Sequence, residues 1–181
     1  EKQKNQNEME QRSKELKEYY TMWVHQIKTP ISALRLLLQE KDKEMDLAEE
    51  RDELFEIEQY VEMVLQYMRL GSETTDFVLR KVNMDSIIRE AIHKYARLFI
   101  RRKIALHYTP IQMPIVTDEK WMCFVIGQLL SNALKYTPSG CVTIKTEQEG
   151  VLVIEDTGIG IRAEDFPRVF EKGYTGYNGH A

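Results

Sequence analysis

Residues 128–138 read QLLSNALKYTP, a run with helical periodicity that ends at a proline. Four polar side chains share one face of the predicted helix, at positions i, i+4, i+7 and i+8: Gln128, Asn132, Lys135 and Tyr136. An amide oxygen suits Mg²⁺, a lysine suits phosphate and an aromatic ring suits a nucleobase. An ordinary solvated helix face would look the same. The run alone therefore favours neither interpretation, a binding site or an ordinary helix surface, over the other.

A second motif, Asp156-Thr157-Gly158-Ile159-Gly160, comes directly after a predicted strand. Its glycines would let the backbone approach a ligand closely, and a buried Asp156 would accept a hydrogen bond from an exocyclic amine. A bare Gly-x-Gly is often only a turn. Beyond it, the glycine-rich stretch from Glu171 to Gly176, which includes Lys172, has the composition of a mobile lid.

The residues around these motifs predict mixed α and β structure from Phe77 onward. Strands are expected at 77–82, 104–108 and 115–117, a helix at 85–99, and a second helix from an Asp118 cap to about Tyr136. A hairpin is expected to join 142–147 and 151–155 around Glu149-Gly150. Helices combined with antiparallel strands indicate an α+β sandwich.

The first part of the chain predicts two long helices. Apolar residues recur every three or four positions from Leu16 to Leu38 and again from Leu54 to Met68. The charged stretch Glu40 to Glu50 between them is expected to contain the turn. Two helices with one apolar stripe each bury those stripes best by dimerising into a four-helix bundle. The alternative is a hairpin that packs on its own globular domain.

The third motif, His25-Gln26-Ile27-Lys28-Thr29-Pro30, lies inside the first predicted helix. His25 stands two residues from the apolar position on either side, about 200° around the helix, so we expect it to face solvent. Thr29 lies one turn further along the same face. Pro30 removes a helical hydrogen bond and costs about 3 kcal/mol in a helix interior, so the helix should bend beside the histidine.

In this order the motifs resemble the boxes of HisKA-type sensor histidine kinases with a GHKL (Bergerat-type) ATP-binding domain. The corresponding stretches are 25–30, 128–136, 156–160 and 166–170. Two longer stretches, WVHQIKTP at 23–30 and FEKGYTGYNG at 170–179, are similar to the intramembrane-sensing kinases of bacitracin-type peptide resistance. Members of that group resemble one another in having two membrane helices, almost no extracellular domain and a partner ABC transporter.

The resemblance implies autophosphorylation of His25 from ATP with Mg²⁺, Gln26 orienting the imidazole and Thr29 positioning water for dephosphorylation of a regulator. It implies that the phosphoryl group passes to an aspartate in the receiver domain of a response regulator. A homodimer at the cytoplasmic face of the cell membrane, with an ABC transporter as a further partner, is expected on the same grounds. The implied nucleotide ligands are Asn132, Lys135, Tyr136, Asp156, Gly158, Gly160 and Lys172, and the implied metal ligands are Asn132 and Gln128.

Three features depart from the family's pattern. Gln26 stands where most members carry an acidic residue after the histidine, and Gln128 replaces the first asparagine of its box. The family's second glycine-rich box and its last helix and strand should follow the lid, whereas this chain stops at Ala181. We therefore expect an ATP-binding domain truncated at its C-terminal end, with an incomplete phosphate side.

The predicted organisation is a helical hairpin for dimerisation and phosphotransfer over 1–71, a linker over 72–76 and an ATP-binding domain over 77–181. The net charge of −4 argues against broad nucleic-acid binding. No apolar run approaches the roughly 20 residues that cross a bilayer. Cys123 and Cys141 are too few for a disulfide framework or a zinc site, and we expect them to be buried free thiols.

Two other functions fit part of the pattern. One is a dimeric signalling scaffold that has lost catalysis, for which Gln26, Gln128 and the missing box would be the signs. The other is a GHKL ATPase or serine kinase unrelated to histidine chemistry. That second alternative has no use for an exposed His25 one turn before Thr29, so it ranks last.

Overall fold

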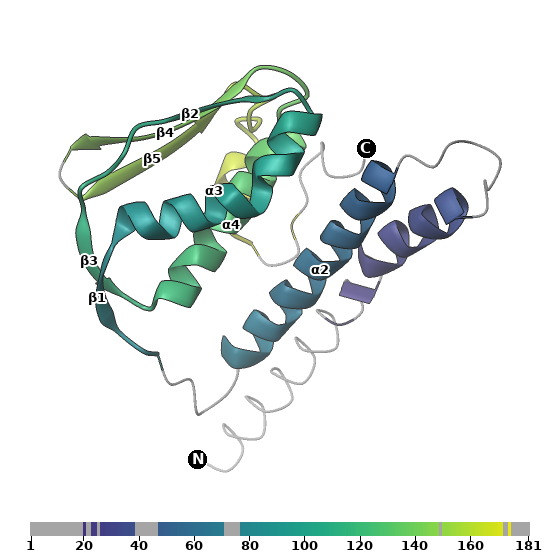
Figure 1. The fold of residues 1–181 in the computed structure, drawn as a ribbon, viewed down its shortest axis with the longest axis horizontal. Helices are drawn as coiled ribbons and strands as arrows, with labels where there is room; N and C mark the ends of the chain where they lie inside the picture. The colour runs from purple at the N-terminus through teal and green to yellow at the C-terminus, as the bar shows by residue number, and fades with distance from the viewer. Residues whose placement is uncertain are drawn as a thin grey trace, which may run out of the picture. The chain divides into compact units, whose positions relative to one another are not determined.

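Contacts along the chain define two units, which are residues 1–75 with 168–181 and residues 76–167. The structure is a computed structural model, and it describes residues 20, 23–24, 26–38, 47–70, 77–148, 150–171 and 174 (Figure 1). The linker predicted at 72–76 lies outside the described residues. Residues 47–50 of the predicted turn are helical, and its remainder also lies outside them.

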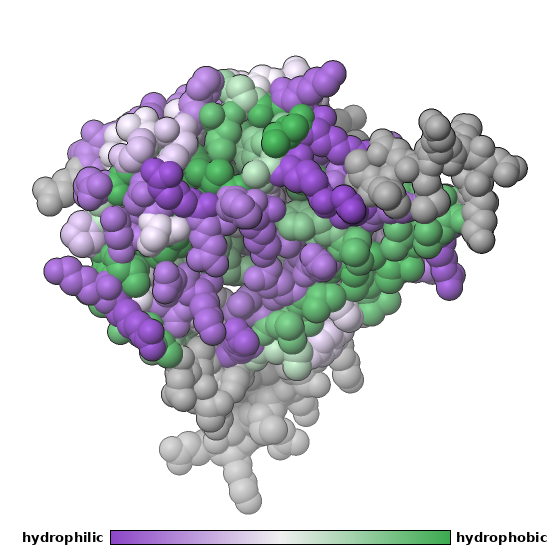
Figure 2. Space-filling model, viewed as in Figure 1, coloured by the Kyte–Doolittle hydropathy of each residue, from purple (hydrophilic) through white to green (hydrophobic). Residues whose placement is uncertain are grey.

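The first unit is helical wherever its backbone before residue 71 is described. Residues 26–38 stay helical through Pro30, which is buried, and α2 spans Leu47–Leu70. The indole Nε1 of Trp23 donates to the backbone carbonyl of Tyr60 at 3.1 Å and so joins the two helical stretches. Figure 2 shows hydrophobic surface along these helices. The helical hairpin of the predicted fold class is confirmed.

The second unit is the predicted α+β sandwich (Figure 1). Strand β4 (Cys141–Gln148) lies between β2 (Ala105–Tyr108), which is parallel to it, and β5 (Val151–Asp156), which is antiparallel. Helices α3 (Met84–Arg101) and α4 (Glu119–Tyr136) pack against each other beside this sheet. The largest fully buried hydrophobic side chains are Ile87, Ile88 and Tyr95 of α3, Ile126 and Leu130 of α4, and Val142 and Ile144 of β4.

A separate pair of short strands accompanies the sandwich. β1 (Arg80–Asn83) pairs antiparallel with β3 (Pro114–Thr117). A single 3₁₀ turn, η1, spans Phe166–Arg168. Among the described residues, no helix is both long and apolar enough to cross a membrane.

Three details differ from or extend the sequence predictions. The strand expected from Phe77 begins only at β1, because the Val78 N–H donates to the Asp118 carboxylate at 2.9 Å instead of to a neighbouring strand. Asp118 also caps α4 as predicted, accepting from the Trp121 N–H at 3.0 Å. The prediction of buried thiols is wrong, because Cys123 and Cys141 are both only half-buried.

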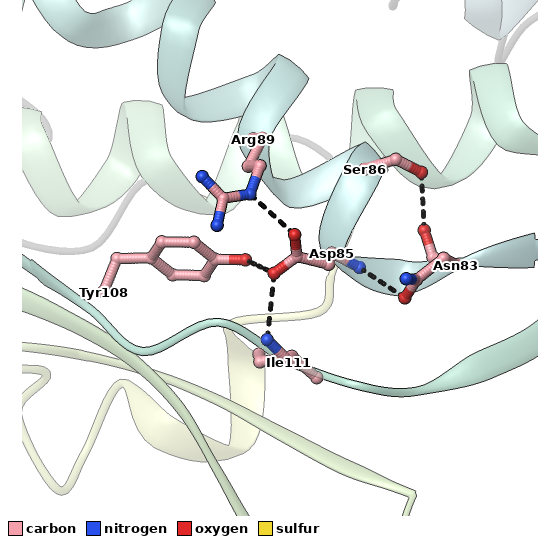
Figure 3. A network of polar contacts seen from close by, with 6 residues as sticks. All are labelled: Asn83, Asp85, Ser86, Arg89, Tyr108 and Ile111. Carbon is pink, nitrogen blue, oxygen red and sulfur yellow. Dashed lines mark hydrogen bonds and ion pairs between the residues drawn. The ribbon is translucent and has the colours of Figure 1, made fainter.

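Asp85, in the first turn of α3, ties that helix to the chain that follows β2 (Figure 3). Its Oδ1 accepts hydrogen bonds from the Tyr108 hydroxyl and, at 2.9 Å, from the Ile111 N–H. Its Oδ2 accepts from Arg89 Nε at 2.6 Å. The Tyr108 bond leads the contacts that lower the pKa of Asp85 to about 2. Burial, helped by the bond to Asp85, raises the pKa of Tyr108 to about 12.

Replacing Asp85 with asparagine should make stability less dependent on pH in the acid range. Because the pKa of Asp85 falls from 3.8 to about 2 on folding, its ionised form stabilises the native state fully above about pH 4. That contribution is lost as the pH falls through about 2. The gap in melting temperature between wild type and Asp85→Asn should therefore close between about pH 4 and pH 2.

Glu90→Gln, at an exposed position of the same helix, is the matched control and should leave the pH profile of the melting temperature unchanged. A wild-type to Asp85→Asn gap of constant size across the acid range would contradict the role given to this carboxylate.

Candidate functional site

The candidate site forms where the C-terminal end of α4 meets the turn that follows β5. Helix α4 ends at Tyr136, and Thr137 adopts extended backbone dihedrals, as expected for a residue that precedes a proline. The last carbonyls of a helix lack partners within the helix. Here the Ile159 N–H donates to the Tyr136 carbonyl at 3.0 Å. The turn thus supplies a partner for the last carbonyl of the helix, while Arg102 Nη1 donates to the Leu134 carbonyl at 2.9 Å.

Glycine is favoured at each of two positions of the turn, for a different physical reason at each. A Cβ on Gly158 would lie 2.2 Å from the Tyr136 carbonyl oxygen and 2.8 Å from Thr137 Oγ1, so only glycine permits this approach. Gly160 has open space around it but a φ of +68°, in the left-handed region that favours glycine. Gly158 therefore sets the contact with the helix, and Gly160 sets the direction in which the chain leaves.

Asp156 is held at the start of the turn. Its Oδ1 accepts from the Gly158 N–H at 2.9 Å and from the Thr137 hydroxyl at 3.4 Å. The sequence prediction of a buried Asp156 is wrong. Its side chain is exposed because it stands at the end of β5, where none of the described elements covers it. Asp156 Oδ1 is thus engaged with the protein, whereas none of the described residues hydrogen-bonds Oδ2 of this exposed side chain.

Thr157 attaches the turn to the opposite strand. Its backbone N–H and its hydroxyl both donate to the Cys141 carbonyl, at 3.1 and 3.3 Å. The Cys141 N–H donates back to the Thr157 hydroxyl oxygen at 3.0 Å. The turn is therefore anchored on two sides, by β4 and by the end of α4.

The exposed face of α4 leads toward this turn. Asn132 and Lys135 are exposed, Gln128 and Tyr136 are half-buried, and Lys135 Nζ lies 5.3 Å from the centre of the Tyr136 ring. Lysine and ring thus form one contiguous surface of positive charge and aromatic area. Beside them on the helix, Val125 and Leu129 are exposed apolar residues.

The donor set on α4 fits a metal ion that is carried by phosphates. No cluster of three or more His, Cys, Asp or Glu side chains occurs in the described parts of the chain. Mg²⁺ commonly keeps water and substrate phosphates as most of its ligands and takes only one or two from the protein. The exposed amide of Asn132, with Gln128 one turn away, is compatible with such a minor share.

The structure brings together part of the predicted site. Gly158 lies against the Tyr136 carbonyl and donates to Asp156 Oδ1, and Asn132 and Lys135 lie on the adjoining helix face. His25 and Lys172 lie outside the described residues. In the first unit, Thr29 is exposed, and the Gln26 side-chain oxygen is buried with no hydrogen-bond partner among the described residues.

Sequence reasoning missed two residues of the site. Thr137 and Thr157 were not among the predicted site residues, yet their hydroxyls hold Asp156 and the turn. The signal available for Thr137 was its place between the end of a predicted helix and Pro138.

Comparison with known proteins shows which families this chain resembles. Residues 117–181 match the model of the histidine kinase-, DNA gyrase B- and HSP90-like ATPase family. The chain is 34% identical over 170 residues to the sensor histidine kinase YxdK of Bacillus subtilis, covering 89% of this chain and 51% of YxdK. It is 34% identical over 162 residues to the sensor protein kinase GraS of Staphylococcus aureus, covering 86% of this chain and 46% of GraS.

A third relative and two solved structures extend the likeness. The sensor protein BceS of Halalkalibacterium halodurans is 32% identical over 156 residues, covering 84% of this chain and 47% of BceS. The chain thus spans about half the length of these relatives. The histidine kinase ThkA, in complex with the response regulator TrrA, has a similar fold (TM-score 0.62, 17% identity, 96% of this chain, 55% of that chain). The histidine kinase AdeS of Acinetobacter baumannii also has a similar fold (TM-score 0.53, 22% identity, 78% of this chain, 76% of that chain).

Gly158→Ala should release the turn from α4, because the added Cβ would overlap the Tyr136 carbonyl. Amide hydrogen exchange at Ile159 measures this contact, and its rate should rise about tenfold or more as local opening becomes easier. Gly160→Ala is the matched control: it strains the backbone by about 1–2 kcal/mol but collides with nothing, so it should leave Ile159 protected. Equal protection in the two variants would argue against the contact.

Proposed function

We propose that this chain, which belongs to the sensor histidine kinases with a GHKL-type ATPase domain, binds ATP in its second unit and transfers the γ-phosphoryl group to His25. The observation that carries the proposal is the docking of the 156–160 turn on the end of α4. This contact joins an acceptor for a base amine, an aromatic ring and a helix face with an amide and a lysine.

The nucleotide would lie along α4 with its base at the turn. The open oxygen of Asp156 would accept from the exocyclic amine of adenine, beside the Tyr136 ring. The phosphates would then extend toward Lys135 and Asn132. Mg²⁺, held by the phosphates with Asn132 and the neighbouring Gln128 as protein ligands, would neutralise charge that develops during transfer.

The phosphoryl acceptor is His25 in its neutral form. Its ring nitrogen forms a bond to the γ-phosphorus as the bond from phosphorus to the β,γ-bridging oxygen breaks, ADP leaves, and the ring proton passes to solvent. Gln26 cannot take up that proton near neutral pH, but its amide oxygen, which has no partner among the described residues, can orient an imidazole N–H. Phosphoryl transfer depends more on positioning and charge neutralisation than on a strong base.

Dimerisation through the first unit is part of the proposal. Two exposed apolar series have strict seven-residue spacing, Val24, Ile31 and Leu38 on the first helical stretch and Leu54, Val61 and Met68 on α2. All six side chains are between 38% and 51% exposed in the single chain. A heptad repeat left uncovered in this way is typical of helices that pair with another copy.

The remaining assignments follow from the resemblance of the motifs to this family. The phosphoryl group would pass from His25 to an aspartate in the receiver domain of a response regulator, with Thr29 positioning water in the reverse dephosphorylation. The resemblance of residues 23–30 and 170–179 to the intramembrane-sensing kinases of bacitracin-type peptide resistance motivates a role in sensing cell-envelope stress or antimicrobial peptides, with an ABC transporter as a further partner. The whole protein would be anchored in the cell membrane with this region on the cytoplasmic face.

A signalling scaffold without catalysis is the second candidate. The identity of residue 26 favours it, since a glutamine that cannot act as a base is what loss of catalysis would leave there. The two candidates share the dimer and the nucleotide site, and they differ only in whether a phosphoramidate forms.

Incubation of the full-length protein with Mg·ATP labelled at the γ-phosphate should yield a product that acid hydrolyses and base spares. Serine and threonine phosphates behave in the opposite way. His25→Gln should reduce the label to background without weakening ATP binding, because the two groups lie in different units. His93→Gln, at an exposed histidine of α3, is the control and should label normally. ATP binding without any acid-labile phosphate would instead establish the scaffold.

Val61→Glu should convert the dimer to a monomer, because it would place an unpaired charge in the apolar seam. Light scattering should give twice the chain mass of 21.3 kDa for the wild type and the single mass for the variant. Val116→Glu makes the same change at a valine on β3 that is 71% exposed and outside the heptad series, and it should remain dimeric. A wild-type protein of single mass at tens of micromolar would refute the proposed interface.

A further inference from the structure

We propose that the Thr137 hydroxyl is a positioning group that determines nucleobase selectivity by fixing the orientation of the Asp156 carboxylate. The inference rests on the proposed nucleotide site and adds to it a residue that touches Asp156 from within the protein. Thr137 is 1% exposed, so it acts from beneath the site and not on its surface.

A hydroxyl in this position calls for an explanation. Thr137 is buried at the end of α4, where valine would fill the same volume without a polar atom to satisfy. A hydroxyl buried without a partner is costly. The described partner of this one is Asp156 Oδ1, at 3.4 Å. That distance is longer than an ordinary O–H···O bond, and hydrogen bonds at binding sites commonly tighten only when the ligand is bound.

Two donors converge on the same carboxylate oxygen. The Gly158 N–H reaches Oδ1 at 2.9 Å from the turn, and the Thr137 hydroxyl reaches it from the helix side. A carboxylate whose Oδ1 accepts only one hydrogen bond can still rotate about that hydrogen bond. Two donors that reach Oδ1 from different directions fix the plane of the carboxylate. Oδ2 is then presented outward as an acceptor of defined direction.

This arrangement favours a base with an amine over a base with a carbonyl at the contacting edge. An ionised carboxylate only accepts hydrogen bonds, so an amine is matched and a carbonyl oxygen is repelled. Discrimination depends on how rigidly Oδ2 is directed, because a mobile carboxylate can turn away from the wrong base. A site built to hydrogen-bond one group of its ligand rejects a ligand that lacks this group, because the polar groups of the site are then left unpaired.

The test uses the matched pair Thr137→Ser and Thr137→Ala in the full-length protein, which differ from each other only in the hydroxyl. The probes are ATP and inosine triphosphate, which carries a carbonyl where ATP carries the amine. The measured quantity is the ratio of the two dissociation constants. General damage to the fold weakens both nucleotides alike and leaves that ratio unchanged, which separates positioning from a merely structural role.

Thr137→Ser should keep the wild-type preference for ATP, and Thr137→Ala should lower it about three- to tenfold, the range expected for one hydrogen bond. Thr137→Val, which keeps the volume of threonine, should behave like the alanine variant. Equal ratios in the serine and alanine variants, or a wild-type protein that does not prefer ATP, would overturn the inference. Failure of the proposed function has a different signature, because no protein in the series would then bind ATP or form the acid-labile phosphate.

Discussion

The carbonyl oxygen of Tyr136 is the point on which the candidate site depends. It belongs to the last turn of α4, so it has no partner within its helix, and the Ile159 N–H supplies one at 3.0 Å. That bond requires the chain to pass so close that residue 158 must lack a Cβ. The carbonyl at the end of this helix thereby requires a glycine at position 158 and holds the turn that begins at Asp156 against α4.

The rest of the second unit holds the end of α4 and the 156–160 turn in fixed positions relative to each other. Buried side chains of α3, α4 and β4, such as Ile88, Leu130 and Ile144, fix the helices against the sheet. The Asp85 network joins the start of α3 to the chain after β2, far along the sequence from the turn. The site itself remains exposed, so the packed core supplies rigidity while the turn supplies the groups that a ligand can reach.

The first unit has the opposite character. Its described helices leave two heptad series uncovered, and Trp23 donates to the carbonyl of Tyr60 to hold them together. An apolar stripe of this kind gains most from burial against another helix surface. The chain therefore separates its proposed tasks: a self-contained sandwich for the nucleotide, and a helical hairpin whose exposed seam suits assembly and which carries His25.

The sequence by itself predicted most of the elements and the likeness to histidine kinases. The three-to-four periodicity of 119–136, the Asp118 cap and the turn at Gly150 depend on residues only a few positions apart, so they can be read from the chain. The likeness to histidine kinases could be recognised because each motif is a short run of residues and the motifs follow one another in the family's order. Only the tertiary structure decided that Thr137 reaches Asp156 across 19 positions, that Gly158 is required by a carbonyl, and that Asp156 is exposed. Such contacts arise from the way helix and sheet pack together, and no local pattern of residue types encodes the distance between them.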